Sequence, residues 1–335
     1  MFTALAKNVI RVGNLVANPG QTVKGRLEVG RFADSSMLTI PVMVVNGTGE
    51  GPTLYIQAAC HGVELNGVEV LRRLVATISP SQLRGALIVV PVANVVAFTH
   101  RTRQTHWDLE DMNRVWPGKA NGNMSQRMAH VLYQAGVAQA DYLIDLHTGS
   151  GTMVTHIRMA AEGESGILAQ VFGTELLVKE AMDEGFKERR YDGKLRIVAD
   201  QAGIPGITPE LGGHSRLQEE IVQVGLRGVR NVMKHLAMID GQLELPPEQT
   251  VVSYDSNSIL RATLGGLFVA AVTPGQRVQA GQEIGRLYDV ATFDTLEVYR
   301  APYDGLVMSY TEDPVRHFGD SIATIARLEG VIQNA

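Results

Sequence analysis

The sequence has a single cysteine, Cys60, among its 335 residues. One cysteine cannot form a disulfide within the chain, so an intrachain disulfide framework is excluded and a reducing compartment is indicated. Basic residues are not in excess either: 30 Lys and Arg stand against 35 Asp and Glu, a net charge of −5. The chain therefore lacks the basic surface typical of proteins that bind nucleic acid.

Long apolar segments are also missing. A run such as "ALIVVPVANVVAF" is interrupted by Pro91 and Asn94 and falls short of the ~20 apolar residues that a membrane span needs. The N-terminal "MFTALAKNVIRVG" has no convincing signal-peptide core followed by a cleavage site. We therefore expect a soluble cytoplasmic protein with no nucleic-acid and no membrane partner, and homo-oligomerisation is left open.

Up to about residue 240, short apolar runs alternate with helical patterns. "GPTLYIQAAC", "GALIVVPVAN" and "ADYLIDLH" are typical of buried strands, whereas "GVEVLRRLVATI", "SQRMAHVLYQAGVAQ" and "LQEEIVQVGLRGVRNVMKHL" are typical of helices. Strands separated by helices of this length indicate βαβ units. The sequence thus predicts an α/β fold with a mixed, mostly parallel sheet and helices on both faces.

A linker and a different pattern follow. "DGQLELPPEQT" contains adjacent prolines, and after it short strands are separated by turn dipeptides such as Pro274-Gly275 and Asp304-Gly305. We predict two domains, residues 1–242 with a β-rich N-terminal segment and residues 250–335 as a small all-β module. The module resembles the barrel-sandwich fold of biotinyl and lipoyl carrier domains. A carrier needs a lysine at a hairpin tip, and no lysine follows Lys234, so a structural or substrate-shaping role is expected instead.

The stretch "AACHGVELNGVEV" places a histidine three residues before a glutamate where a strand meets a helix. The carboxyl ends of strands are where sites form in open α/β sheets. The spacing would let His61 and Glu64 converge on one metal ion, with Glu64 expected in the first turn of the helix. The alternative is that Glu64 only favours the positive end of the helix dipole, an effect of about 0.3–1 kcal/mol.

A second strand end is "YLIDLHTGSG", where His147 follows an apolar run. With His61 and Glu64 it completes a His-Glu-His set of the kind that holds zinc in hydrolases. Asp145 shares a strand face with His147. A core histidine bonded to backbone and a buried carboxylate that serves packing are the alternatives for this pair.

Two further stretches carry groups that such a site would need. In "GIPGITPELGG", Glu210 is a candidate to take a proton from water and deliver it to a leaving amine, the alternative being a solvated loop glutamate. The long polar loop "RTRQTHWDLEDMNRVWPG" carries Arg103, Asn113 and Arg114. Arginine matches a carboxylate and can polarise a carbonyl oxygen, although arginines on loops are usually surface groups.

Together these stretches resemble the succinylglutamate desuccinylase and aspartoacylase family of the zinc carboxypeptidase superfamily. The matching motifs are "HGVELNG", "TRQTHWDLEDMNRVWPG", "DLHTG" and "GIPGITPELG", in the family's order between residues 61 and 213. Each motif is weak alone, but four in order make a specific match, and the β module after residue 250 also fits. The resemblance implies a zinc carboxypeptidase-like fold and a zinc amidohydrolase acting on linear amides.

The resemblance also implies roles by motif position. One Zn²⁺ per chain would be held by His61, Glu64 and His147, with Glu210 as general base and acid and Arg103 polarising the scissile carbonyl.

Other positions concern the substrate. Asn113 and Arg114 would grip a substrate carboxylate, Asp111 would hold a ligand histidine, and Arg158 in "THIRMA" falls near a substrate-binding arginine of the family. The chain departs from the family at Met112, where leucine is frequent. No tyrosine of the β module is assigned, and the available ones are Tyr288, Tyr299 and Tyr303.

We therefore expect a zinc-dependent deacylase that hydrolyses the amide bond of an N-acyl amino acid or a related small carboxylate by metal-activated water. Nitrogen and carboxylate ligands suit zinc without excluding other divalent metals. One alternative is a metallocarboxypeptidase acting on a peptide or peptidoglycan stem, with Arg114 on the terminal carboxylate. A second is a non-catalytic binding protein on the same fold.

Overall fold

The computed structural model describes residues 9–149, 153–159, 163–180, 188 and 190–334. Most of the N-terminal stretch examined for a signal peptide, residues 1–8, lies outside this range, as do residues 150 and 151 of "YLIDLHTGSG". No helix in the described part of the chain is both long and apolar enough to cross a membrane.

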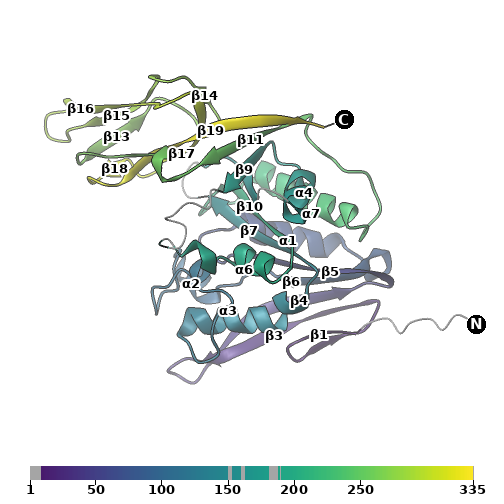
Figure 1. The fold of residues 1–335 in the computed structure, drawn as a ribbon. Coiled ribbons are helices and arrows are strands. Elements are labelled where there is room, and N and C mark those ends of the chain that lie inside the picture. The colour runs from purple at the N-terminus through teal and green to yellow at the C-terminus, as the bar shows by residue number, and fades with distance from the viewer. Residues whose placement is uncertain (1–8, 150–152, 160–162, 181–187, 189, 335) are drawn as a thin grey trace, which may run out of the picture.

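One large mixed sheet forms the centre of the molecule (Figure 1). Its strands are β3 (Gln21–Arg31), β4 (Met37–Asn46), β5 (Gly49–Ala58), β6 (Arg84–Val90), β7 (Tyr142–Gly149), β8 (His156–Met159), β9 (Leu176–Glu180), β10 (Gly206–Gly213), β11 (Glu248–Tyr254), β12 (Ile259–Arg261), β14 (Arg277–Val278), β17 (Gly305–Tyr310) and β19 (Ser321–Gln333). Over the described residues the 13 strands lie in the order β14-β17-β19-β11-β9-β8-β10-β7-β5-β6-β4-β3, with β12 paired to β19. The adjacent pairs β10–β7, β7–β5 and β5–β6 are parallel.

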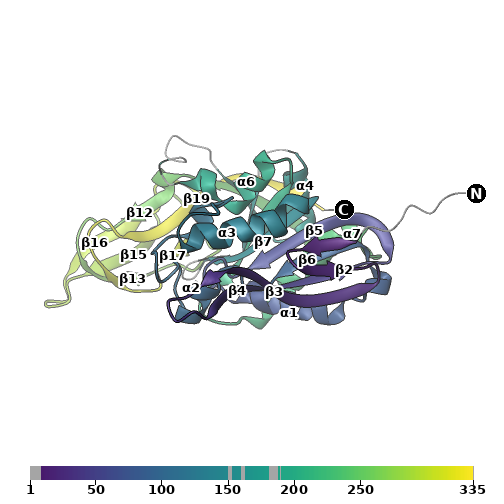
Figure 2. The same cartoon turned by 90° about the horizontal axis from the view of Figure 1, so that it is seen from below.

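Helices cover both faces of this sheet (Figures 1 and 2). They are α1 (Asn66–Thr77), α2 (Val95–His100), α3 (Met124–Ala135), α4 (Glu164–Phe172), α6 (Leu195–Gln201) and α7 (Glu219–His235). Helices α1, α4 and α7 share one hydrophobic cluster with the sheet, through residues such as Leu71 and Val229. Helices α2, α3 and α6 share the other, through residues such as Leu132 and Leu195. The predicted α/β fold, a mixed sheet between two helical layers, is confirmed. The expectation of a mostly parallel sheet holds only for its centre, because five strand pairings of the described sheet are parallel and seven are antiparallel.

Local sequence explains these helices. In α1 the buried residues Val70, Leu71 and Leu74 recur at helical spacing, so one stripe faces the core. Asn123 and Gln126 form a capping box at the start of α3. Helix α7 has Glu219 and Glu220 in its first turn and basic residues in its last turn, which complements the helix dipole.

The C-terminal region is all-β, as predicted. Strands β13 (Gly266–Ala270), β15 (Glu283–Tyr288), β16 (Thr295–Arg300) and β18 (Val315–Arg316) form an antiparallel sheet in the order β16-β15-β13-β18. A hydrophobic cluster that includes Phe268, Leu287, Val307 and Ile325 joins this small sheet to β17 and β19. The region is hydrogen-bonded to the large sheet, because β11 pairs with β9 in parallel and with β19 antiparallel. The division into domains at residues 242–250 stays a prediction.

Shorter elements complete the chain. The hairpin of β1 (Ile10–Val12) and β2 (Leu15–Ala17) packs beside β3. Short 3₁₀ turns occur at η1 (Pro80–Gln82), η2 (Met112–Arg114), η3 (Val137–Gln139), η4 (Tyr191–Gly193) and η5 (Ser256–Ser258). For the site, the important consequence is that β5, β7 and β10 are parallel neighbours. Their carboxyl ends therefore meet at one edge of the sheet.

Candidate metal centre and active site

His61 and Glu64 lie in the turn between β5 and α1. Ala59 has a positive φ of 48°, which redirects the chain after the strand. Gly62 follows, where a Cβ atom would stand 2.0 Å from the backbone of Ala97, so only glycine fits. Glu64 precedes α1, which begins at Asn66, so the expectation that Glu64 lies in the first helical turn is wrong. The turn, rather than the helix, directs the Glu64 side chain.

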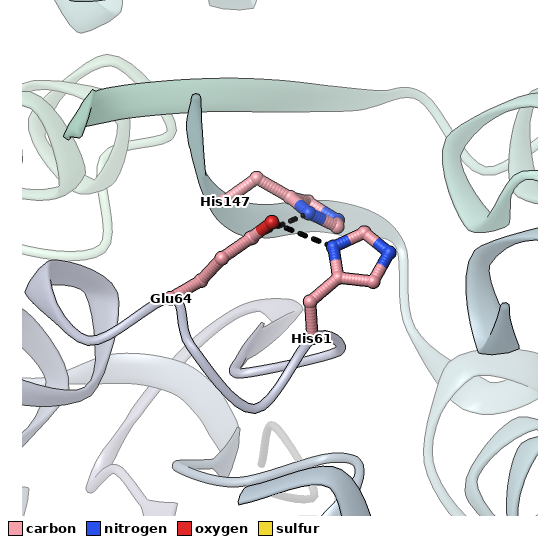
Figure 3. Close-up of side chains that lie close together, drawn as sticks. All are labelled: His61, Glu64 and His147. Atoms are coloured by element: carbon pink, nitrogen blue, oxygen red, sulfur yellow. Dashed lines mark hydrogen bonds and ion pairs between the residues drawn. The ribbon is translucent and has the colours of Figure 1, made fainter. Parts of the chain in front are cut away.

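His147 comes from the neighbouring strand β7 and meets this turn (Figure 3). The Nδ1 atom of His61 lies 2.6 Å from Oε1 of Glu64, and Nδ1 of His147 lies 2.9 Å from Oε2. All three side chains are buried. Within the described residues they form a group whose ligand atoms lie within 4.8 Å of one another, which could hold a metal ion.

Each of the two histidines has a carboxylate behind it. Asp111 Oδ1 lies 2.9 Å from Nε2 of His61, and Asp145 Oδ2 lies 2.9 Å from Nε2 of His147. A ring nitrogen that donates to a carboxylate leaves the other nitrogen as an electron-pair donor, and this arrangement is common at metal-binding histidines. Both Nδ1 atoms therefore face Glu64.

The charges of this cluster perturb each other strongly. Burial raises the pKa of Glu64, but the charges of His61 and His147 outweigh it and hold the pKa below its ordinary value. Burial lowers the pKa of His147, yet Asp145 and Glu64 together raise it well above its ordinary value. The site thus concentrates negative charge around two histidines, which favours a cation.

Glu210 lies on β10, in register with His147 on β7. Its Oε1 accepts a hydrogen bond of 3.0 Å from Nε of Arg158, which lies on β8. Burial raises the pKa of Glu210, but the charges of Arg158 and His147 lower it by more than burial raises it. The net pKa lies below its ordinary value, so the carboxylate is ionised at neutral pH. Glu210 is a strand residue with an exposed side-chain fraction of 12%, not a solvated loop residue.

Arg103 extends from the loop after α2 towards the same point. Its Nη2 atom lies 3.0 Å from Oδ2 of Asp111, and Nη1 lies 3.7 Å from Oε1 of Glu64. The side chain is half exposed. Burial raises the pKa of Asp111, but the hydrogen bond with His61 and the charge of Arg103 outweigh it and keep the pKa below its ordinary value.

Asn113 and Arg114 occupy the 3₁₀ turn η2, which Asp111 caps by accepting a hydrogen bond from the backbone N–H of Asn113. The side-chain oxygen Oδ1 of Asn113 accepts a hydrogen bond of 3.1 Å from the backbone N–H of Leu195, so this side chain also anchors α6. The guanidinium carbon of Arg114 lies 4.7 Å from the ring centroid of Tyr191. The turn therefore holds Arg114 against an aromatic face.

These side chains surround one cavity of about 420 Å³. The candidate ligands, Glu210, Arg103, Asn113, Arg114 and Arg158 all line it, whereas the two carboxylates behind the histidines, Asp111 and Asp145, do not. Sequence reasoning missed several others that also line it: Tyr191, Lys194, Arg196, Tyr254, Asp255 and Arg261. Tyr254 and Asp255 lie there because β11 pairs with β9, and Arg261 lies on β12, which pairs with β19; the sequence carries no local signal for these long-range contacts.

None of the three tyrosines considered from the sequence lines this cavity. Tyr299 is buried and donates to Glu297, and Tyr303 donates to the carbonyl of Ile325. The tyrosine from the C-terminal region that does line it is Tyr254, at the end of β11. Arg158 lies over its ring, with the guanidinium carbon 5.4 Å from the centroid.

Comparison with known proteins assigns the chain to a family. Residues 50–236 match the family model for the succinylglutamate desuccinylase/aspartoacylase catalytic domain. The chain belongs to the succinylglutamate desuccinylase/aspartoacylase family. The matched range contains all the candidate ligands and Glu210, and membership supports amide hydrolysis as the chemistry.

Relatives agree with this assignment over most of the chain. A curated protein from Halomonas elongata, an N-alpha-acetyl-L-2,4-diaminobutyric acid deacetylase, is 29% identical over 300 residues, 86% of each chain. A succinylglutamate desuccinylase/aspartoacylase structure from Rhodobacter sphaeroides is 26% identical with a TM-score of 0.81, covering 92% of this chain and 95% of that one. The product-bound ectoine utilization protein EutE (DoeB) from Ruegeria pomeroyi is 25% identical with a TM-score of 0.82, covering 91% and 94%.

Proposed function

We propose that this chain is a zinc-dependent deacylase that hydrolyses the amide bond of an N-acyl amino acid or a related small carboxylate. The observation that carries the proposal is the convergence of His61, Glu64 and His147 in one cavity with Glu210 and Arg103. Family membership and the deacetylase from Halomonas elongata support the reaction class.

The donor set fits zinc. Two imidazole nitrogens and a carboxylate are a usual ligand set of catalytic zinc, which keeps a further position open for water or substrate. Asp111 and Asp145 hold the two histidines in the tautomer that presents Nδ1 to an ion. Zinc held by His61, Glu64 and His147 would polarise the scissile carbonyl and lower the pKa of the attacking water.

The remaining steps fall to the side chains around the ligands. The ionised Glu210 takes the proton of the attacking water and later delivers it to the departing amine. Arg103 donates hydrogen bonds to the oxygen that becomes negative during attack. Because Arg158 donates to Glu210, it keeps the carboxylate ionised and fixed until the proton arrives. The products are a carboxylate and a free amine.

A substrate carboxylate matches the cationic side of the cavity. We assign it to Arg114, whose guanidinium offers parallel donors and is held against Tyr191. The cavity volume of about 420 Å³ is that of a small-molecule site. Side chains from residues 254–261 of the C-terminal region line one side of the cavity. They leave less room for a long substrate, which favours a small molecule over a peptide or peptidoglycan stem.

The proposal is tested by amine release from zinc-loaded protein. N-acetyl and N-succinyl amino acids, with N-acetyl-2,4-diaminobutyrate among them, are compared with peptides that have a free C-terminus. We expect release from at least one N-acyl amino acid and none from the peptides. Release from peptides alone would favour the carboxypeptidase, and zinc binding without any turnover would favour a binding protein.

A further inference from the structure

A buried polar chain runs from His147 away from the cavity into the core. Tyr55 and Gln57 are two residues apart on β5, so their side chains lie on the same face of the sheet, and both are fully buried. In the pairing of β5 with β7, Gln57 is the register partner of Asp145. Asp145 in turn shares its face with His147, two residues further on, so the four side chains are contiguous.

The hydrogen bonds of this chain have one consistent direction. The phenol of Tyr55 donates to Oε1 of Gln57 at 2.9 Å, and Nε2 of Gln57 donates to Oδ1 of Asp145 at 2.8 Å. The other oxygen of Asp145 lies 2.9 Å from Nε2 of His147. Turning the Gln57 amide over would set its carbonyl oxygen against the Asp145 carboxylate, two acceptors without a proton between them.

This direction determines what His147 offers to an ion. With one oxygen of Asp145 satisfied by the Gln57 amide, the other is aimed at the ring and accepts the Nε2–H proton. Nδ1 of His147, which lies 2.9 Å from Oε2 of Glu64, is then the ring nitrogen that would give up its proton and present its lone pair to an ion. Burial, with the nearby charge of Asp145, raises the pKa of Tyr55 well above its ordinary value, so the phenol remains a donor.

Packing alone gives no reason for a glutamine at this position. The stretch "LYIQAA" is otherwise apolar but for the Tyr55 hydroxyl, and its residues are buried in the sheet. A buried amide is costly unless its hydrogen bonds are made, and an aliphatic side chain of similar size would fill the space without that cost. Gln57 is therefore explained by the carboxylate that it contacts.

The two histidines are supported from different sides. Asp111, behind His61, is held by Arg103 and by the backbone of Asn113 at the cavity. Asp145, behind His147, has the amide of Gln57 on its core side. The second arrangement is buried, and in the protein interior hydrogen bonds are strong and their loss is costly.

We propose that Gln57, supported by Tyr55, is a positioning residue that orients Asp145 and thereby fixes the metal-binding face of His147. This inference rests on the proposed function, because it takes His147 as a metal ligand. Two residues of β5 that do not line the cavity would thus help to position a metal ligand.

The test compares zinc affinity in two matched variants. Gln57→Met removes the donor to Asp145. Gln249→Met removes an equally buried glutamine whose Nε2 donates to the carbonyls of Thr174 and Gln170, and Gln249 does not line the cavity. Zinc dissociation constants are measured by competition with a chromophoric chelator on folded protein, and visible spectra of the Co²⁺-loaded proteins report ligand geometry.

We expect Gln57→Met to weaken zinc binding by about 10–100-fold and to alter the Co²⁺ spectrum. The zinc dissociation constant of Gln249→Met should stay within about twofold of the wild-type value. Both variants lose a buried amide donor, so their melting temperatures should fall by similar amounts, but only Gln57 donates to a carboxylate behind a candidate ligand. Unchanged zinc affinity in folded Gln57→Met would overturn the inference.

The inference can still be tested if Gln57→Met does not fold, and its failure can be distinguished from failure of the proposed function. If Gln57→Met does not fold, Tyr55→Phe, which removes one hydroxyl, carries the test: weaker zinc binding supports the inference and unchanged binding overturns it. If the wild-type protein itself takes up no zinc, the proposed function fails and this inference fails with it. Zinc binding by wild type with no effect of either variant overturns the inference alone.

Discussion

His147 on β7 and Glu210 on β10 are register partners on adjacent parallel strands, and both side chains line the same cavity. The pairing sets a candidate metal ligand and a candidate base side by side without any loop between them. Positions on strands of a packed sheet are held more rigidly than positions on loops. The position of the proposed proton acceptor relative to the proposed metal ligand is thus set by strand pairing in the core of the fold.

Replacing Glu210 by Gln should abolish turnover and spare the metal. The amide keeps the size of the side chain but cannot accept a proton, so we expect kcat to fall by about 10²–10⁴-fold. Zinc content is measured on the same samples, with the exposed Glu220→Gln as control. A Glu210→Gln protein with full zinc and more than about a tenth of wild-type activity would remove Glu210 from its role.

Arg103→Ala should lower kcat more than it changes KM. Loss of a donor to the developing negative oxygen typically costs about 10²–10³ in kcat. Because Arg103 also contacts Asp111 and Glu64, zinc content must be measured in parallel. Arg103→Lys keeps the charge without the planar fork and should recover only part of the rate. An equal rise in KM with kcat unchanged would mean that Arg103 serves binding instead.

Arg114→Ala should raise KM about 10–100-fold with a small effect on kcat, since a charged hydrogen bond contributes about 1.5–3 kcal/mol. The exposed Arg72→Ala is the control. A substrate whose carboxylate is converted to an amide should bind poorly to wild type and no worse to the variant. If the variant penalises both substrates equally, Arg114 does not hold the carboxylate.

A salt-bridge network between α1 and α7 should make stability depend on acid pH. Hydrogen bonds from Arg72 and Arg73 lower the pKa of Glu69 to about 2 despite burial, and those from Arg73 and Gln223 lower the pKa of Glu219 to about 2. A depressed pKa gives stability that is present above the unfolded value near 4.3 and is lost as pH falls towards 2.

We therefore expect Glu69→Gln to lower the melting temperature at pH 7 by about 2 °C or less, since ion pairs near the surface contribute little. The difference from wild type should shrink as pH falls from about 5 to 3. Thermal unfolding followed by circular dichroism across this range measures it. A difference that is constant with pH would show that the carboxylate charge of Glu69 is not involved.

The parts of the site that could be predicted from sequence lie at the ends of apolar runs. His61 follows a buried strand, and His147 and Glu210 lie towards the ends of two others, so hydrophobic patterning placed them at one sheet edge. The position of Glu64 before α1 depended on turn geometry at Ala59 and Gly62, which patterning does not report.

Other parts depended on contacts between distant segments. Tyr254 reaches the cavity because β11 pairs with β9, and Arg261 does so from β12, which pairs with β19; no local pattern in the sequence predicts either pairing. Tyr191 lies there because η4 packs against η2. Gln57 did have a signal, a polar residue within an apolar strand pattern, but its meaning required the register with Asp145.

The central claim, that His61, Glu64 and His147 hold a catalytic zinc ion, is tested most directly by metal content. Purified wild-type protein and His61→Ala are compared by mass spectrometry after identical preparation, and again after chelation and reconstitution with zinc. We predict about one zinc per chain in wild type and almost none in the variant. Wild-type protein that holds no zinc and takes none up, or His61→Ala protein with as much zinc as wild type, would contradict the account.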